Sequence, residues 1–148
     1  MIPEPDLSAL SGSVVIPEPD LSAVAGVIGV GIDVVDVARF GEVLARRPRV
    51  RDRCFTAGEQ AAAASRPDPV ESLAARFAAK EAVLKVLGLG IFDVPLTEIE
   101  VCGGGTVAVW LAPGPSLERA ASAHGIGGWR LSLTHSGGVA AAVAVGLA

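Results

Sequence analysis

The sequence predicts an α+β fold in which an antiparallel sheet packs on one long helix. Residues 26–33 alternate apolar side chains with glycine, which is the periodicity of a strand. Residues 69–87 form an Ala-rich segment that opens with a strong helix-start signal. Residues 97–111 and 129–147 each contain two alternating runs joined by a glycine turn, as hairpins do. Helices and hairpins mixed along one chain are typical of the α+β class.

Composition restricts the class of protein further. The 148 residues fit one domain, and a charged fraction of 19% argues against a disordered chain. Two cysteines, Cys54 and Cys102, are too few for a disulfide framework and lack metal-ligand spacing. The net charge is −4 and the longest apolar stretch is interrupted by glycines. We therefore expect a cytoplasmic protein that binds neither nucleic acid nor membrane.

The first residues contain an exact repeat. Residues 2–9 and 16–23 both read IPEPDLSA, and each copy has two prolines and two acidic residues. Residues 1–20 contain no Lys or Arg, so the basic region of a signal peptide is missing. This composition suits an extended tail. We expect a disordered tail at 1–25 and a folded domain at 26–148.

The first strand should bring a carboxylate to its end. Residues 28–33 alternate Ile or Val with Gly or Asp33, so one face is apolar and the other nearly bare. Glycine at such positions permits close approach of a ligand or of another backbone. Asp36 is expected to cap a helix that runs toward Pro48.

Two further helix starts are visible. Thr56 and Glu59 have the spacing of a capping box, which predicts a short Ala-rich helix. Asp68 followed by Pro69 predicts the start of the long helix, and Gly88 its end.

The second half of the chain should contain the hairpins and one short helix. Gly103–Gly105 and Gly137 mark the two hairpin turns. Ser116 is expected to cap a helix of about two turns that ends near Gly125.

A few polar residues stand out as candidates for chemistry. Glu81 and Lys85 are four residues apart and share one helical face, so they form either a surface ion pair or a functional cluster on an enclosed helix. Asp33 is either a helix cap or a functional carboxylate. His135 ends a strand and is either structural or functional. His124 precedes a glycine at a helix end and fits a C-terminal cap.

Basic residues are concentrated in one part of the chain. Residues 39–85 hold ten of the twelve Lys and Arg residues. This concentration indicates either a solvated face or a docking surface for an acidic partner. The densest group consists of Arg46, Arg47, Arg49, Arg51 and Arg53.

Taken in chain order, three segments resemble the holo-acyl-carrier-protein synthase family, the small single-domain 4′-phosphopantetheinyl transferases. They are GIDVVDVARF at 31–40, RFAAKEA at 76–82 and LSLTH at 131–135. The resemblance extends over about residues 26–146, and the RFAAKEA run is its most specific part.

The resemblance implies transfer of the 4′-phosphopantetheine arm of coenzyme A to a serine of an apo acyl carrier protein, with Mg²⁺ required and adenosine 3′,5′-bisphosphate released. It also implies a homotrimer with active sites between subunits. Asp33 and Glu81 match the family's metal-binding positions, and Lys85 matches its phosphate-contacting lysine. Arg76 and His135 match positions near the coenzyme's phosphates. Together with Lys85 they form the expected coenzyme-binding set, which also includes Lys80, a residue of the same motif with a less clear role. The residues expected to take part in catalysis are Glu81, Lys85 and His135, and the base that takes the serine proton is a metal-bound water, Glu81 or His135.

In this family the first helix and the following loop contact the carrier protein, which is acidic. The resemblance therefore assigns carrier docking to Arg39 and to the arginine group from Arg46 to Arg53. Ser136 and the turn at Gly103–Gly105 depart from the family's usual residues, which leaves fatty-acid and polyketide carriers both open. Two other functions remain as alternatives, a coenzyme A-binding trimeric module without turnover and a metal-dependent phosphohydrolase.

Overall fold

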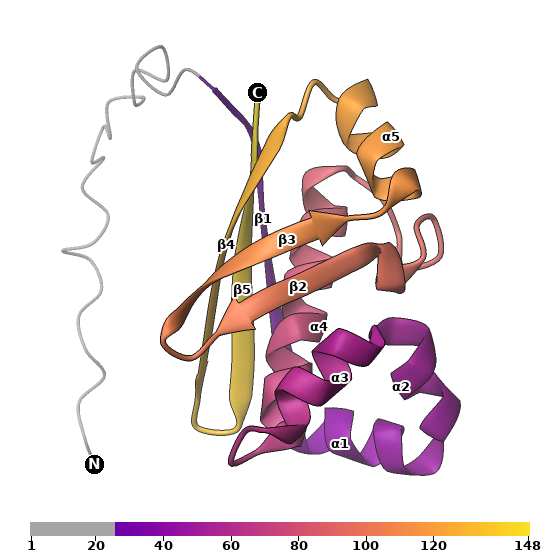
Figure 1. Cartoon of the computed structure of the whole chain (residues 1–148), viewed down its shortest axis with the longest axis vertical. Coiled ribbons are helices and arrows are strands. Elements are labelled where there is room, and N and C mark those ends of the chain that lie inside the picture. Colours follow the sequence, from indigo (N-terminus) through magenta and orange to yellow (C-terminus); the bar gives the residue numbers. More distant parts are fainter. Residues whose placement is uncertain (1–25) are drawn as a thin grey trace, which may run out of the picture.

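The computed structural model describes residues 26–148, so the duplicated segment and the expected tail lie outside the described residues. Two antiparallel sheets and a set of helices make up the described chain (Figure 1). None of its helices combines the length and the apolar character needed to cross a membrane. In chain order the elements are β1 (Val27–Asp36), α1 (Val37–Arg46), α2 (Pro48–Cys54), α3 (Ala57–Ala64), α4 (Pro69–Val86), the 3₁₀ turn η3 (Leu96–Glu98), β2 (Ile99–Gly104), β3 (Val107–Pro113), α5 (Pro115–Ala123), β4 (Gly128–Ser136) and β5 (Val139–Leu147).

The larger sheet has the order β1-β5-β4, and β2 pairs with β3 in a separate hairpin. Helix α4 packs against β1 and β5 on one side and contacts α3 and β2 on the other (Figure 1). Its residues include much of the core, with Leu73, Ala74, Val83 and Leu84 all buried. The predicted α+β class with antiparallel pairing is confirmed.

Strand β1 packs on α4 through its glycines. A Cβ atom added at Gly31 would overlap the carbonyl oxygen of Ala82, and one at Gly29 would lie 3.1 Å from Val86 Cγ1. The neighbouring strand β5 presents small residues to the same helix, among them the buried Ala144. The glycine face of β1 is therefore the face that contacts the helix, and the distance between strand and helix is one that only small residues permit.

The apolar face of β1 consequently points away from the helix. Val30, Ile32 and Val34 are 62%, 59% and 60% exposed, although they are large hydrophobic residues. A row of exposed aliphatic side chains on one strand is unusual for a surface that stays in water.

Three of the predicted helix starts are confirmed by their caps. The side chain of Asp36 accepts a hydrogen bond from Arg39 N at 2.8 Å, and that of Asp68 accepts one from Glu71 N at 3.0 Å. Thr56 begins α3 with the reciprocal capping box expected from its spacing. His124 is the C-cap residue of α5, as predicted.

Two local features differ from what the sequence predicts. The helix expected to run toward Pro48 is α1, which ends at Arg46, but Pro48 then begins α2, a helix that the sequence did not predict. Proline lacks an N–H and has a helical φ, so the same residue fits a helix start as well as a stop. Ser116 is not the N-cap of α5, because Gly114 occupies that position. The backbone N–H of Ser116 donates to the Glu98 carboxylate instead.

Gly31→Ala is expected to lower the free energy of unfolding by about 1–3 kcal/mol, because the new methyl group would force β1 away from α4. Urea unfolding measures this change. Gly128→Ala in β4 is the matched control, since its Cβ would meet only Leu147 Cβ, at 3.9 Å. Equal stability of the two variants would contradict the close packing of β1 on α4.

Candidate functional site

Three of the residues singled out in the sequence meet where β1 contacts α4. Asp33 lies on the glycine face of β1, and Glu81 and Lys85 lie on α4. Lys85 Nζ donates to Asp33 Oδ1 at 2.9 Å and to the carbonyl oxygen of Ile32 at 2.9 Å. Lys85 therefore pairs across to the strand, and within residues 26–148 it forms no ion pair with Glu81.

In this carboxylate cluster (Asp33, Glu81 and Lys85) the negative charge of Glu81 is unfavourable. Burial raises the pKa of Glu81, the negative charge of Asp33 raises it further, and Lys85 lowers it. One lysine thus faces two carboxylates, so the cluster favours an additional positive charge.

These residues fit a magnesium ion. Mg²⁺ is usually held by one or two protein carboxylates, with substrate phosphates and waters completing its shell. The described residues contain no cluster of three or more His, Cys, Asp or Glu side chains that would form a complete protein cage. Asp33 and Glu81 supply two carboxylates, and a divalent cation between them would relieve the repulsion that raises the pKa of Glu81.

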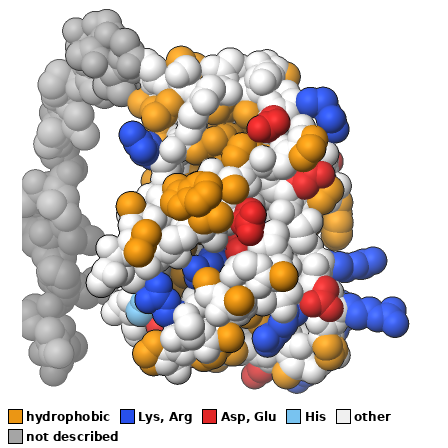
Figure 2. All heavy atoms as spheres, in the orientation of Figure 1, with side chains coloured by type: hydrophobic (Ala, Val, Ile, Leu, Met, Phe, Trp, Pro, Cys, Tyr) orange, Lys and Arg blue, Asp and Glu red, His pale blue; other side chains and the backbone are white. Residues whose placement is uncertain are grey.

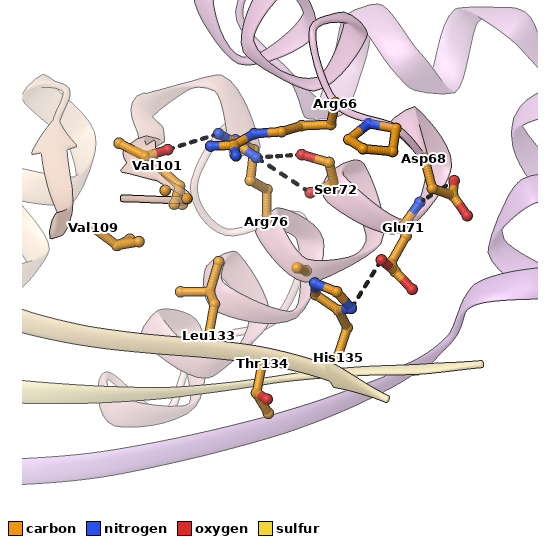
Figure 3. Close-up of a pocket in the computed structure, with 15 residues that line it drawn as sticks. Arg66, Asp68, Glu71, Ser72, Arg76, Val101, Val109, Leu133, Thr134 and His135 are labelled. Carbon is orange, nitrogen blue, oxygen red and sulfur yellow. Dashed lines mark hydrogen bonds and ion pairs between the residues drawn. The ribbon is translucent and has the colours of Figure 1, made fainter. Parts of the chain in front are cut away.

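A second group of polar residues lines a cavity of about 660 Å³ between the start of α4, the β2–β3 turn and the end of β4 (Figure 3). The cavity is lined by Arg66, Glu71, Arg76 and His135, among others, and by the turn at Gly103–Gly105. Neither carboxylate of the β1 cluster lines it.

Arg76 is buried at the back of this cavity. Its Nη1 donates to Ser72 Oγ at 2.6 Å and its Nη2 donates to the carbonyl oxygen of Gly103 at 2.9 Å. Its Nε–H has no hydrogen-bond partner among the described residues. Burial lowers the pKa of Arg76, Glu59 raises it, and the like charge of Arg66 lowers it. A buried guanidinium with an unused donor beside a second cation suits an anion.

Arg66 lies over the glycine turn, as the space around that turn shows. A Cβ at Gly105 would overlap the Arg66 guanidinium, and one at Gly104 would lie 3.4 Å from its Nη2. The three turn glycines have φ values of +80°, +110° and +70°, which other residues rarely adopt. Sequence reasoning missed Arg66, because its only signal is its place in the short loop before the cap of α4.

His135 occupies the other end of the cavity and is paired with Glu71. Its Nδ1 lies 2.8 Å from Glu71 Oε1, and both side chains are partly exposed. Figure 3 shows the pair facing the cavity from the end of β4 and the first turn of α4.

Lys80 has a different position from the one expected. It is fully buried, and its Nζ donates to Glu59 Oε2 at 2.9 Å and to the carbonyl oxygens of Leu96 and Ile99 at 2.7 and 2.8 Å. All three ammonium protons are therefore used inside the protein, which ties α4 to α3, η3 and β2. Burial lowers the pKa of Lys80, against the effect of Glu59. The side chain does not line the cavity, so it is left out of the coenzyme-binding set proposed below.

The arginine group lies on α1 and α2. Figure 2 shows basic side chains projecting from the side of the molecule that these two helices form. Within the described chain none of these arginines is in an ion pair, so their charges face solvent. The exposed arginines of this surface are Arg39, Arg46, Arg47, Arg49, Arg51 and Arg53.

The candidate residues thus form two groups on different edges of the large sheet. The carboxylate cluster lies at β1 and the cavity lies at β4, with β5 between these strands. A single chain does not bring the two groups together.

Comparison with known proteins gives consistent results. The family model of the 4′-phosphopantetheinyl transferase superfamily matches residues 29–143. A holo-[acyl-carrier-protein] synthase of Frankia casuarinae is 50% identical over 123 residues, covering 80% of this chain and 96% of that protein. The crystal structure of the synthase from Neisseria meningitidis aligns with a TM-score of 0.72 at 28% identity, over 81% of this chain and 98% of that one. The synthase from Bacillus anthracis, in complex with CoA (3′,5′-ADP), aligns with a TM-score of 0.68 at 28% identity, over 84% and 99% of the two chains.

Glu81→Gln is expected to stabilise the protein at neutral pH. A carboxyl whose pKa is raised by folding disfavours the folded state once it ionises, so the wild type loses stability as pH rises from the ordinary glutamate pKa through the raised one. The variant should match the wild type in acid and exceed it above that window. Urea unfolding across pH, without divalent cations, measures the difference, and exposed Glu42→Gln is the control. A variant that is less stable than the wild type at neutral pH would contradict an unfavourable negative charge at Glu81.

Proposed function

The chain belongs to the holo-[acyl-carrier-protein] synthases of the 4′-phosphopantetheinyl transferase superfamily, and on that premise we propose the following reaction. In the cytoplasm, a serine hydroxyl of an apo acyl carrier protein attacks the phosphorus that carries the pantetheine arm of coenzyme A. The new bond joins this phosphorus to the serine oxygen, and the bond to the other phosphate of the pyrophosphate breaks. The products are the holo carrier protein and adenosine 3′,5′-bisphosphate, and the reaction depends on Mg²⁺.

The observation that carries this proposal is the carboxylate cluster. Phosphoryl-type transfers need reactants to be positioned and charge to be offset more than they need covalent chemistry. Asp33 and Glu81 would hold the Mg²⁺, which supplies positive charge to the pyrophosphate. Lys85 Nζ is hydrogen-bonded to Asp33 and partly exposed near the end of α4. It would place a positive charge beside the same phosphates.

The cavity at β4 is the proposed site for the remaining phosphate of the coenzyme. Arg66 and Arg76 place two guanidinium groups on it, and the Arg76 Nε–H offers an unused donor. His135 and the turn at Gly103–Gly105 complete its wall. A relative from Bacillus anthracis was solved in complex with CoA (3′,5′-ADP), which supports a coenzyme site in this fold.

A second copy of the chain is needed to join the two groups. We propose a homotrimer of the domain at 26–148, with each active site between subunits, in which the β1 edge of one copy faces the β4 edge of the next. The exposed row formed by Val30, Ile32 and Val34 supports this arrangement, because such a face is stabilised when another chain covers it. Closed cyclic symmetry uses one such contact three times.

The arginine surface on α1 and α2 is the proposed docking site for the carrier protein, of fatty-acid or polyketide type. Its charges are unpaired in the described chain and lie close together in sequence, which suits an acidic partner. Exposed charge pairs are screened by salt, so carrier binding should weaken as ionic strength rises.

The transferase activity is tested by intact mass spectrometry of a small apo acyl carrier protein incubated with this protein, coenzyme A and Mg²⁺. We expect the carrier to gain one phosphopantetheine arm, and we expect no gain with Glu81→Gln or with EDTA. If several fatty-acid and polyketide carriers gain nothing while coenzyme A still binds, a coenzyme-binding module without turnover is the better description. Release of adenosine 3′,5′-bisphosphate without any carrier would indicate a phosphohydrolase.

Arg51→Glu is expected to raise the KM for the carrier about tenfold and to leave the KM for coenzyme A unchanged, because a rim charge acts mainly on encounter. Steady-state kinetics with each substrate varied in turn separates the two constants, and added salt should shrink the difference from the wild type. Arg119→Glu on α5 is the control for a charge reversal outside the surface. An equal effect from both variants would contradict the proposal that the carrier docks on α1 and α2.

A further inference from the structure

The contact between Glu71 and His135 joins two elements that carry different parts of the cavity. Glu71 lies in the first turn of α4, where its backbone N–H is held by the Asp68 cap at 3.0 Å. His135 lies near the end of β4, and its backbone is held in register opposite Ala140 of β5. The fold therefore holds both backbones, and Glu71 Oε1 lies 2.8 Å from His135 Nδ1.

This contact determines where the ring proton lies. A carboxylate oxygen only accepts hydrogen bonds, so the nitrogen that faces it must carry a proton. A neutral His135 then has its proton on Nδ1 and a free lone pair on Nε2. No described residue forms a hydrogen bond with Nε2, and the residue lines the cavity that also contains both guanidinium groups (Figure 3).

We propose that Glu71 is a positioning residue for His135. Its carboxylate keeps the proton on Nδ1, fixes the orientation of the ring and leaves Nε2 available to the coenzyme and the acceptor serine. The proposal rests on the proposed transferase function, since it assigns to His135 a role at that site. Glu71 itself touches neither substrate.

Glu71 also has a plain structural contribution, and a test must separate the two. An acidic residue in the first turn of a helix stabilises it through the helix dipole. Glu71→Gln and Glu71→Ala both remove that charge. Only Glu71→Ala also removes the oxygen that accepts from Nδ1, so the difference between these variants reports the loss of that acceptor at equal charge.

Nitrogen NMR of protein labelled with ¹⁵N-histidine measures the tautomer directly. The described chain and the full sequence contain only His124 and His135, and His124→Gln assigns the two rings. His124 is an internal reference, because its Nδ1 lies 2.8 Å from the carbonyl oxygen of Ala120, far from Glu71 in the fold. Spectra are compared at a pH above which the ring signals no longer move.

We expect His135 to be protonated on Nδ1 in the wild type and in Glu71→Gln. In Glu71→Ala we expect it to lose this preference while His124 is unchanged. Unchanged His135 ring shifts in Glu71→Ala would overturn the proposal. This comparison needs no activity, so it decides the proposal even if the wild type transfers nothing, a result that would defeat only the proposed function.

Kinetics give the second readout. Glu71→Ala is expected to lower kcat/KM for coenzyme A about ten- to a hundredfold, with Glu71→Gln closer to the wild type. In a His135→Ala background the same substitution should have no further effect, because Glu71 acts through the ring. An equal loss in both backgrounds would show that Glu71 acts on the fold directly and would overturn the positioning role.

Discussion

The contact of β1 with α4 through backbone rather than side chains determines the rest of the structure. With no Cβ at Gly31, the strand lies against the carbonyl of Ala82, one residue after Glu81. Two residues along the same face of the strand, Asp33 is brought to Lys85. The same alternation turns the large aliphatic residues of β1 outward, which leaves an apolar face uncovered. One packing constraint thus produces both the carboxylate cluster and the surface on which a second copy would pack.

The RFAAKEA segment serves three separate environments. Arg76 and Lys80 are four residues apart, so they lie on one side of α4 about one turn apart, where Arg76 reaches the cavity and Lys80 reaches the interior. Glu81 is rotated by about 100° from Lys80 and faces β1. Lys80 and Glu59 form a fully buried ion pair, and Glu59 also accepts from Val101 N at 2.8 Å. A buried pair of this kind is tolerated when every donor and acceptor is satisfied, as here. This ion pair holds β2 on α4, and β2 also contains Gly103, whose carbonyl oxygen accepts from Arg76.

The sequence predicted features that depend on local chemistry. The caps at Asp36, Thr56 and Asp68 are set by residues within four positions, and the glycine face of β1 is visible as a period of two. Features that depend on tertiary distance were missed. The sequence shows Lys85 four residues from Glu81, but the nearest partner of its ammonium comes from a strand fifty-two positions earlier. Lys80 carries the same charge as Lys85 and lies in the same motif, and only the packing of α3 and β2 shows that it is structural.

The central claim is that the carboxylate cluster of one chain and the cavity of another form one active site. It is tested most directly by mixing two inactive variants, Glu81→Gln and His135→Ala, with different tags, and assaying the purified mixed oligomer. In a cyclic trimer with sites between subunits, every mixed oligomer has one site in three that combines two intact halves, so about a third of its sites are complete. The account predicts recovery of about that fraction of wild-type activity. A mixed oligomer as inactive as its parents would contradict it, because each chain would then supply its own complete site.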